Sequence, residues 1–210
     1  MPDIKPDSAE TCECLERIRQ GDREALERLL ERHRPALHDF VELHLDPRLR
    51  ARVDPSDVVQ DAQMEVVRRM DDFLVNRPMP FRIWLRKKTY ERLLNLRRDH
   101  LTRARRSVSR EMAWPDRSSL LLARPLLAGG PSPSQQLEAR ELAEKLSRAV
   151  ACLADTDREI LMMRHAEDLP FQEIACPLDI EPGAARKRFG RALIRLQKLL
   201  IEEGLLESQQ

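Results

Sequence analysis

The residues of this 210-residue chain whose types and spacing indicate a chemical role are its lysines and arginines. Nucleophiles, metal ligands and phosphate-binding loops do not occur in the spacings that catalysis requires. The four cysteines form no pair of C-x-x-C knuckles, and the sequence holds no G-x-x-x-x-G-K phosphate loop and no nucleophile beside a base. Cys12 and Cys14 lie near His33 and His38, which leaves a weak metal site as an alternative to ordinary free thiols. We expect a non-enzyme without a resident cofactor or metal.

Charge is gathered in blocks, although the chain as a whole has a net charge of only +1. Residues 81–110 contain eleven Lys or Arg against two Asp or Glu, and residues 186–210 contain six against three. The segments 1–80 and 111–185 are net acidic. Self-repulsion opposes a cationic block, so a polyanionic partner such as nucleic acid explains it better than a solvated face does.

Composition predicts an all-α fold. The chain is 41% hydrophobic and 35% charged, with only 6 glycines and 4% aromatic residues, which favours helices over strands. No apolar run approaches the roughly 18 residues that span a bilayer, and the acidic start lacks a signal-peptide core. We therefore expect a cytoplasmic protein without membrane insertion.

The elements that must position the cations are two helical segments and a linker. Helical periodicity begins near residue 14 after a polar tail over 1–11, and Pro35 is expected to interrupt or kink it. A basic helix is predicted from Phe81 to about His100. Residues 111–136 are rich in Pro, Gly and Ser and lack a period, which indicates a flexible linker between two small helical domains.

The segment 57–73 is predicted to be one amphipathic helix with a carboxylate row. Its apolar stripe runs through Val59, Ala62, Val66 and Met70. Asp57, Asp61 and Glu65 follow at steps of four residues on another face. From the residues alone, that row is either a solubilising face or a surface offered to a basic partner.

Residues 155–201 have the layout of a helix-turn-helix. Ile174 and Ala175 lie on a short first helix, which Cys176-Pro177 is expected to shorten, and Asp179 takes the turn position, where Asp tolerates a left-handed conformation. A second, basic helix begins at Pro182, a residue suited to the first helical position. Recognition helices place their N-terminal residues in the major groove. The alternative is a plain helical hairpin with a solvated basic face.

Two runs of this sequence resemble a known family. DPRLRARVDPSDVVQDAQMEVVRRMDDF, with PMPFRIWLRKKTYERLLNLRRDH, resembles region 2 of bacterial RNA polymerase sigma factors, and residues 146–201 resemble region 4. The order of the two regions resembles that of the extracytoplasmic-function (ECF) group of sigma factors. The motifs DPSDVVQ and PMPF-x-x-WL are similar to those of an ECF subgroup abundant in planctomycete-type bacteria. The resemblance implies a region 2-like domain over 14–110, the linker over 111–136 and a region 4-like domain over 137–204.

The resemblance also implies roles for individual residues. The polar face that would bind core polymerase consists of Asp57, Gln60, Asp61 and Glu65. The residues that would hold the unpaired −10 strand are Arg82, Arg86, Lys87, Lys88, Arg92, Asn95, Arg97 and Arg98. The residues that would contact the duplex −35 element are Gly183, Ala184, Arg186, Lys187, Arg188 and Arg191. Trp84 is interpreted as a core residue rather than a stacking platform for a base.

The function that this resemblance implies is that of a sigma factor. Such a protein binds core RNA polymerase, recognises promoter DNA as a duplex −35 element and a melted −10 element, and helps to open it. An anti-sigma factor is a further candidate partner. The alternative is a helix-turn-helix regulator that binds DNA without core polymerase, which co-purification of the polymerase would distinguish.

Overall fold

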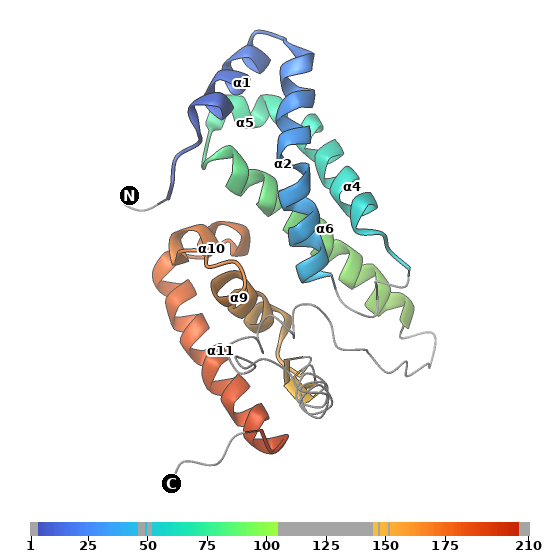
Figure 1. Ribbon diagram of the computed structural model, residues 1–210, viewed down its shortest axis with the longest axis vertical. Helices are drawn as coiled ribbons and strands as arrows, with labels where there is room; N and C mark the ends of the chain where they lie inside the picture. The colour runs from blue at the N-terminus through green and yellow to red at the C-terminus, as the bar shows by residue number, and fades with distance from the viewer. Residues whose placement is uncertain are drawn as a thin grey trace, which may run out of the picture. The chain divides into compact units, whose positions relative to one another are not determined.

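The structure is a computed structural model that describes residues 4–45, 49, 52–104, 145–146, 148–150 and 152–205, with the side chains of 100–104 left out. All regular secondary structure among these residues is helical, which confirms the predicted all-α class. The chain divides into two compact units, Met1–Glu111 and Met112–Gln210, and each is described by itself (Figure 1). The predicted linker, 111–136, lies outside the described residues.

The N-terminal unit is a bundle in which α2 contacts α1, α4 and α6, and α4 contacts α6 (Figure 1). The helices of this unit are α1 (Ala9–Arg19), α2 (Arg23–His44), α4 (Pro55–Arg68), α5 (Met70–Asn76) and α6 (Phe81–Ala104).

Side chains that begin the helices are the ones expected from capping chemistry. Ser8 accepts a hydrogen bond from the Thr11 amide at 3.3 Å, and Asp22 accepts one from the Ala25 amide at 3.0 Å. These oxygens satisfy amide groups that have no partner inside the helix. α1 therefore begins at Ala9, so the last three residues of the polar segment 1–11, which was expected to be a tail, are helical.

The core of the N-terminal unit comes from the apolar stripes. Val59, Ala62 and Val66 of α4 are fully buried, as the periodicity predicts. Trp84 is also buried, and its ring stacks on that of Phe73 with centroids 4.3 Å apart. The interpretation of Trp84 as a core residue is thus confirmed.

The sequence-based expectation of helix continuity is wrong at Arg69, and at Pro35 the structure excludes an interruption, which was one of the two expected alternatives. The predicted helix over 57–73 is broken at Arg69, whose backbone (φ −109°, ψ 13°) leaves the helical region, so that α5 starts separately at Met70. Pro35, in contrast, lies inside an unbroken α2. A proline removes one backbone hydrogen bond, and burial of Leu37, Phe40 and Val41 in the core offsets that loss.

The C-terminal unit contains the helix-turn-helix. Its helices are α9 (Asp155–His165), α10 (Phe171–Leu178) and α11 (Pro182–Glu202). Asp179 ends α10 in the left-handed conformation (φ 55°, ψ 45°), as predicted, and the Ile180 amide donates back to the Ala175 carbonyl at 3.1 Å. The expectation that Cys176-Pro177 shortens the helix is wrong, because Pro177 lies in its last turn and costs one hydrogen bond there.

The core of this unit joins all three helices. Ile160 and Met163 of α9, Ile174 of α10, and Ala185 and Ala192 of α11 are buried. Near the end of α11, Leu200 packs with Leu146, Ala149 and Val150. One buried carboxylate, that of Asp157, is paired with Arg195 and so ties α9 to α11. Among the described residues, no helix combines the length and apolarity that crossing a membrane requires.

Candidate functional site

The outer face of α4 carries both polar and apolar groups. Asp57, Gln60 and Asp61 are exposed, as the polar face expected for polymerase binding requires. Met64 and Val67 lie on the same face by helical spacing, and 48% of each is exposed. The sequence reasoning did not identify these two residues, although apolar side chains at positions outside the buried stripe were a visible signal. A surface of this mixed kind fits a protein partner.

Glu65 lies at the edge of that face and already has partners. Its carboxylate accepts a hydrogen bond from Arg69 Nε at 2.5 Å, and an Arg68 nitrogen lies 3.6 Å away. The Arg69 hydrogen bond is the largest cause that lowers the pKa of Glu65, and the charges of Arg69, Arg68 and Lys88 lower it further. Glu65 therefore offers a smaller uncompensated charge to a partner than Asp57 does.

Asp61 connects the two expected interfaces of the N-terminal unit. Its Oδ2 accepts hydrogen bonds from Arg92 Nε at 3.0 Å and from an Arg92 terminal nitrogen at 2.7 Å. Both side chains are partly exposed, so the pair holds α4 against α6 while remaining accessible to a third group. The residue expected to face polymerase thus positions one expected to face DNA.

The cations of α6 are spread around the helix instead of sharing one face. The Arg86 guanidinium lies over the Phe40 ring of α2, 4.7 Å from its centroid. Lys88 and Arg92 are directed to acidic groups, Glu91 at 2.7 Å and Asp61. The exposed members of the set are Asn95 and Arg98, and the Asn95 side-chain oxygen accepts from Arg98, whereas Lys87 is half-buried.

Arg97 requires a correction. It was predicted to contact DNA, but only 7% of it is exposed, and it donates to the His44 backbone carbonyl at 2.6 Å. His44 is the last residue of α2, where carbonyl groups lack helical partners and a cation is favoured. Arg97 is therefore a buried structural cation that closes the end of α2, and it does not present its charge to phosphate in this structure.

The basic surface of α11 is more open than that of α6. Gly183, Ala184, Arg186, Lys187 and Arg191 are exposed, and Arg188 is half-buried. Arg186 lies over the Phe171 ring at 5.6 Å, whereas no hydrogen bond or ion pair within the described chain engages Lys187, Arg188 or Arg191. Cations with no internal partner at the start of a recognition helix suit contact with phosphates.

Gly183 and Gly190 offer a matched test of this surface. A Cβ built on either glycine meets no atom within 4 Å, so alanine is accommodated at both positions. We expect Gly190→Ala to stabilise the protein by up to about 1 kcal/mol through helix propensity, with unchanged DNA affinity. Gly183→Ala should fold as well but weaken binding to a −35 duplex by roughly tenfold, because its methyl group obstructs the close approach of DNA backbone.

The measurements for this pair are thermal unfolding and fluorescence anisotropy with a labelled promoter duplex. Equal affinities of the two alanine variants would show that DNA does not approach the first turn of α11 closely.

His33 marks a titratable point beside the start of α6. Its ring lies 5.5 Å from that of Phe81, and its Nε2 atom is buried without a hydrogen-bond partner among the described residues. Burial is the main cause that lowers the pKa of His33 from its ordinary value of 6.5, with Arg32 and Arg82 acting in the same direction and Asp7 opposing them. The folded protein thus disfavours the charged imidazole.

We expect the free energy of unfolding to fall as the pH drops below 6.5. A lowered folded-state pKa means that the unfolded chain binds more protons, so acidification favours unfolding in this range. Urea unfolding of wild-type protein and of His33→Leu at pH 7.5 and 5.5 measures the effect, since the variant should lose part of the pH dependence. Identical pH dependence in both would contradict this role of His33.

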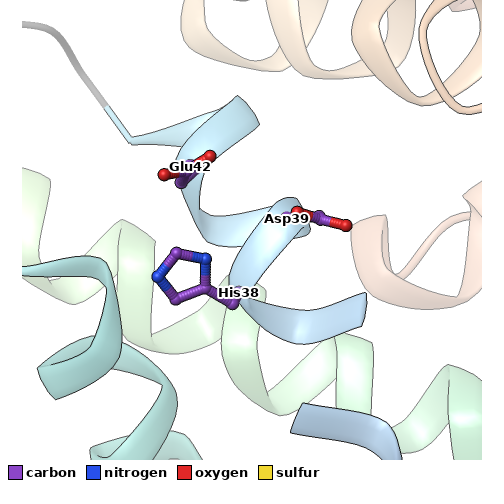
Figure 2. A group of neighbouring side chains, drawn as sticks. All are labelled: His38, Asp39 and Glu42. Carbon is purple, nitrogen blue, oxygen red and sulfur yellow. The ribbon is translucent and has the colours of Figure 1, made fainter. Parts of the chain in front are cut away.

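Three residues whose side chains could bind a metal ion lie close together on α2. Ligand atoms of His38, Asp39 and Glu42 lie within 4.8 Å of one another, and Figure 2 shows all three side chains leaving the same helix. None of the four cysteines, all free, belongs to it. The group shares no residue with the cationic surfaces of α6 or α11.

The fold and these surfaces define a class of protein. The chain is a two-unit helical DNA-binding protein: a helix-turn-helix with an open basic recognition helix in one unit, and a basic helix braced by an acidic one in the other. The Sigma-70 region 4 family matches residues 143–196, which include α9, α10 and most of α11.

Comparison with known proteins identifies the family. The chain is 30% identical over 180 residues to the RNA polymerase sigma factor CnrH of Cupriavidus metallidurans, covering 86% of this chain and 88% of that protein. It is 25% identical over 184 residues to the ECF RNA polymerase sigma-E factor of Escherichia coli K12, covering 85% and 87%. The chain belongs to the ECF family of RNA polymerase sigma factors.

Solved structures agree on the fold. The structure of CnrH in complex with the cytosolic domain of CnrY is similar with a TM-score of 0.57 and 21% identity, over 93% of this chain and 99% of that one. The sigma factor RpoE of Bartonella quintana, in complex with the anti-sigma factor NepR, gives 0.54 and 20%, over 83% and 96%. Because the relatives that the chain matches over most of its length are RNA polymerase sigma factors, the alternative of a helix-turn-helix regulator that does not bind core polymerase is not favoured.

Proposed function

We propose that this sigma factor divides promoter recognition and polymerase binding between its two units. The domain over 14–110 binds core polymerase and holds the melted −10 element, and the domain over 137–204 binds the duplex −35 element. The observation that carries the proposal is the separation of surfaces: an exposed acidic and apolar face on α4, a cationic α6, and an open basic start of α11.

The polymerase-binding surface is assigned to α4. Asp57, Gln60, Asp61 and Glu65 supply polar contacts to a basic and polar partner. Met64 and Val67 add apolar area that is exposed in the free chain, and burial of such area is the main driving force of association. Charged groups then set orientation and rate of encounter.

The −10 strand is assigned to α6 and to the connector that precedes it, which consists of residues 77–80. The residues that would contact it are Arg82, Arg86, Lys87, Lys88, Arg92, Asn95 and Arg98. The two exposed residues of this set, Asn95 and Arg98, are the ones that single-stranded DNA reaches with the smallest rearrangement. Arg97 is excluded from the set by its burial against His44.

The −35 duplex is assigned to the first three turns of α11. Gly183 and Ala184 allow the helix start to approach DNA, and the cations Arg186, Lys187, Arg188 and Arg191 contact phosphates or base edges. Arg195, one turn further, is engaged by Asp157 and serves the fold.

Runoff transcription tests the proposed function. Core polymerase with the protein should start transcription from promoters of its own genome, and core polymerase alone should not. Substituting the −35 element should reduce duplex binding, while substituting the −10 element should reduce opening. Initiation that does not depend on the protein would contradict the proposal.

Partner, location and subgroup follow from the same family membership. The complex of RpoE with NepR supports an anti-sigma factor as a partner of this chain. We assign the chain a non-catalytic role in the cytoplasm, where polymerase works, and place it in the planctomycete-type subgroup on the runs DPSDVVQ and PMPF-x-x-WL. Its membership of that subgroup would be tested by promoter sequences gathered through chromatin immunoprecipitation.

A further inference from the structure

The connector between α5 and α6 is short and conformationally restricted. It consists of Arg77, Pro78, Met79 and Pro80, and two of these four residues are prolines. Arg77 adopts the left-handed conformation (φ 34°, ψ 58°), which is unfavourable for a residue with a side chain. Its amide donates to the Phe73 carbonyl at 2.8 Å, which closes the end of α5. Such a backbone needs support from its surroundings to hold one shape.

The start of α6 has no side-chain cap from its own sequence. The two residues before Phe81 are Met79 and Pro80, which have no side-chain acceptor, and the first turn of the helix contains no acidic residue. The Phe81 amide donates instead to the Asp7 carboxylate, with distances of 3.0 Å to Oδ1 and 2.9 Å to Oδ2. A residue 74 positions earlier in the chain thus provides the negative group that a helix N-terminus favours.

The end of α5 is held by the same N-terminal segment. A terminal nitrogen of Arg19 donates to the Leu74 carbonyl at 2.8 Å. Arg19 is the last residue of α1, whereas Asp7 lies just before Ser8, the residue that caps the start of α1. A third contact, from Arg82 to the Lys5 carbonyl at 2.8 Å, joins the first turn of α6 to this segment again.

We propose that α1 is a brace for the connector and that Asp7 and Arg19 are positioning residues for capture of the −10 strand. Asp7 lies just before α1 and Arg19 ends it, and the two residues hold Phe81 and Leu74 on either side of the connector. The brace keeps 77–80 in the single shape that receives unpaired DNA, so that binding need not bear the cost of ordering it. This inference rests on the assignment of the −10 strand to the connector and α6.

A different role of Asp7 makes the opposite prediction. If its carboxylate stood where a DNA phosphate binds, it would inhibit the free protein, and removing its charge would strengthen DNA binding. Asp7→Asn separates the two roles, because asparagine caps a helix about as well as aspartate but has no charge.

The experiment uses holoenzyme assembled from full-length chains and measures promoter opening by permanganate reactivity of the −10 region. Asp7→Ala and Arg19→Ala should each slow opening by roughly fivefold, the factor that corresponds to loss of a typical cap. Asp7→Asn should open at nearly the wild-type rate. The control is Glu13→Ala, an exposed position on the same helix, which should leave opening unchanged. Affinities for core polymerase and for a −35 duplex should be equal in all variants.

The outcomes separate the inference from the function on which it rests. No initiation by wild-type holoenzyme would overturn the proposed function. Normal initiation with wild-type opening rates in Asp7→Ala and Arg19→Ala would overturn the brace alone. Faster opening in both Asp7→Ala and Asp7→Asn would show Asp7 to be inhibitory. If Asp7→Ala unfolds at the assay temperature, Arg19→Ala decides, since half of its side chain is exposed and its loss leaves the cap of α6 in place.

Discussion

Replacing Met64 by glutamate is expected to weaken binding of core polymerase by roughly ten- to a hundredfold, the range of a substituted interface hot spot. Met64 lies at the centre of the exposed α4 face, between Asp61 and Val67 along the helix. A carboxylate there must lose its hydration on binding and gains no apolar contact in return. Titration of labelled core polymerase with the variant measures the effect.

The fold of the Met64→Glu protein should be unchanged, because nearly half of this residue is already in water. Val75→Glu is the matched control: Val75 is 82% exposed on α5, outside the α4 face, so its variant should bind polymerase as the wild type does. Equal polymerase affinity of the two variants would remove α4 from the interface. Asp61→Lys is less specific, since it also breaks the pair with Arg92.

The features predicted correctly from sequence are those governed by local chemistry. Val59, Ala62 and Val66 are buried because helical spacing alone places them on one side. Asp179 adopts the left-handed conformation at the turn, which could be predicted because Asp tolerates that conformation better than most residues other than glycine. The helix-turn-helix followed from such local signals, and its match to a known family is independent of them.

The features that sequence did not predict depend on contacts between distant residues. Arg97 is chemically equivalent to Arg98 in the sequence, and only packing of α6 on α2 decides that the first is buried and the second exposed. The break at Arg69 likewise interrupts a helical pattern without a proline or glycine to announce it. Asp7 could not be assigned to α6 from spacing, since it caps a helix 74 residues away.

The structure also shows that several cations of the basic block in α6 have partners within the protein. Counting charges over 81–110 treats every cation as available to DNA. Yet Arg97 closes α2, Arg86 covers Phe40, and Arg92 is held by Asp61. Part of the block therefore holds the bundle together, and its excess charge overstates the number of DNA contacts. The start of α11 shows the reverse: its net charge is smaller, but Lys187, Arg188 and Arg191 engage no partner among the described residues.

That contrast makes α11 the place where loss of cations should affect DNA binding most directly. For the double variant Arg188→Ala/Arg191→Ala, we expect affinity for a −35 duplex to fall by at least roughly tenfold at low salt. The slope of log affinity against log salt concentration should become less steep by about two, because each lost phosphate contact removes about 0.9 from it. Anisotropy titrations at several salt concentrations give both quantities.

Lys198→Ala is the control that separates local contact from general charge. Lys198 is exposed on the same helix, about two turns beyond Arg191, so its loss changes net charge without removing a cation near the recognition turns. Its salt slope should match that of the wild type. Arg195→Ala is unsuitable, because it would leave the buried Asp157 carboxylate without its cation and destabilise the unit. An unchanged slope in the double variant would mean that these arginines do not touch phosphate, and the −35 element would then have to bind another face of the helix-turn-helix.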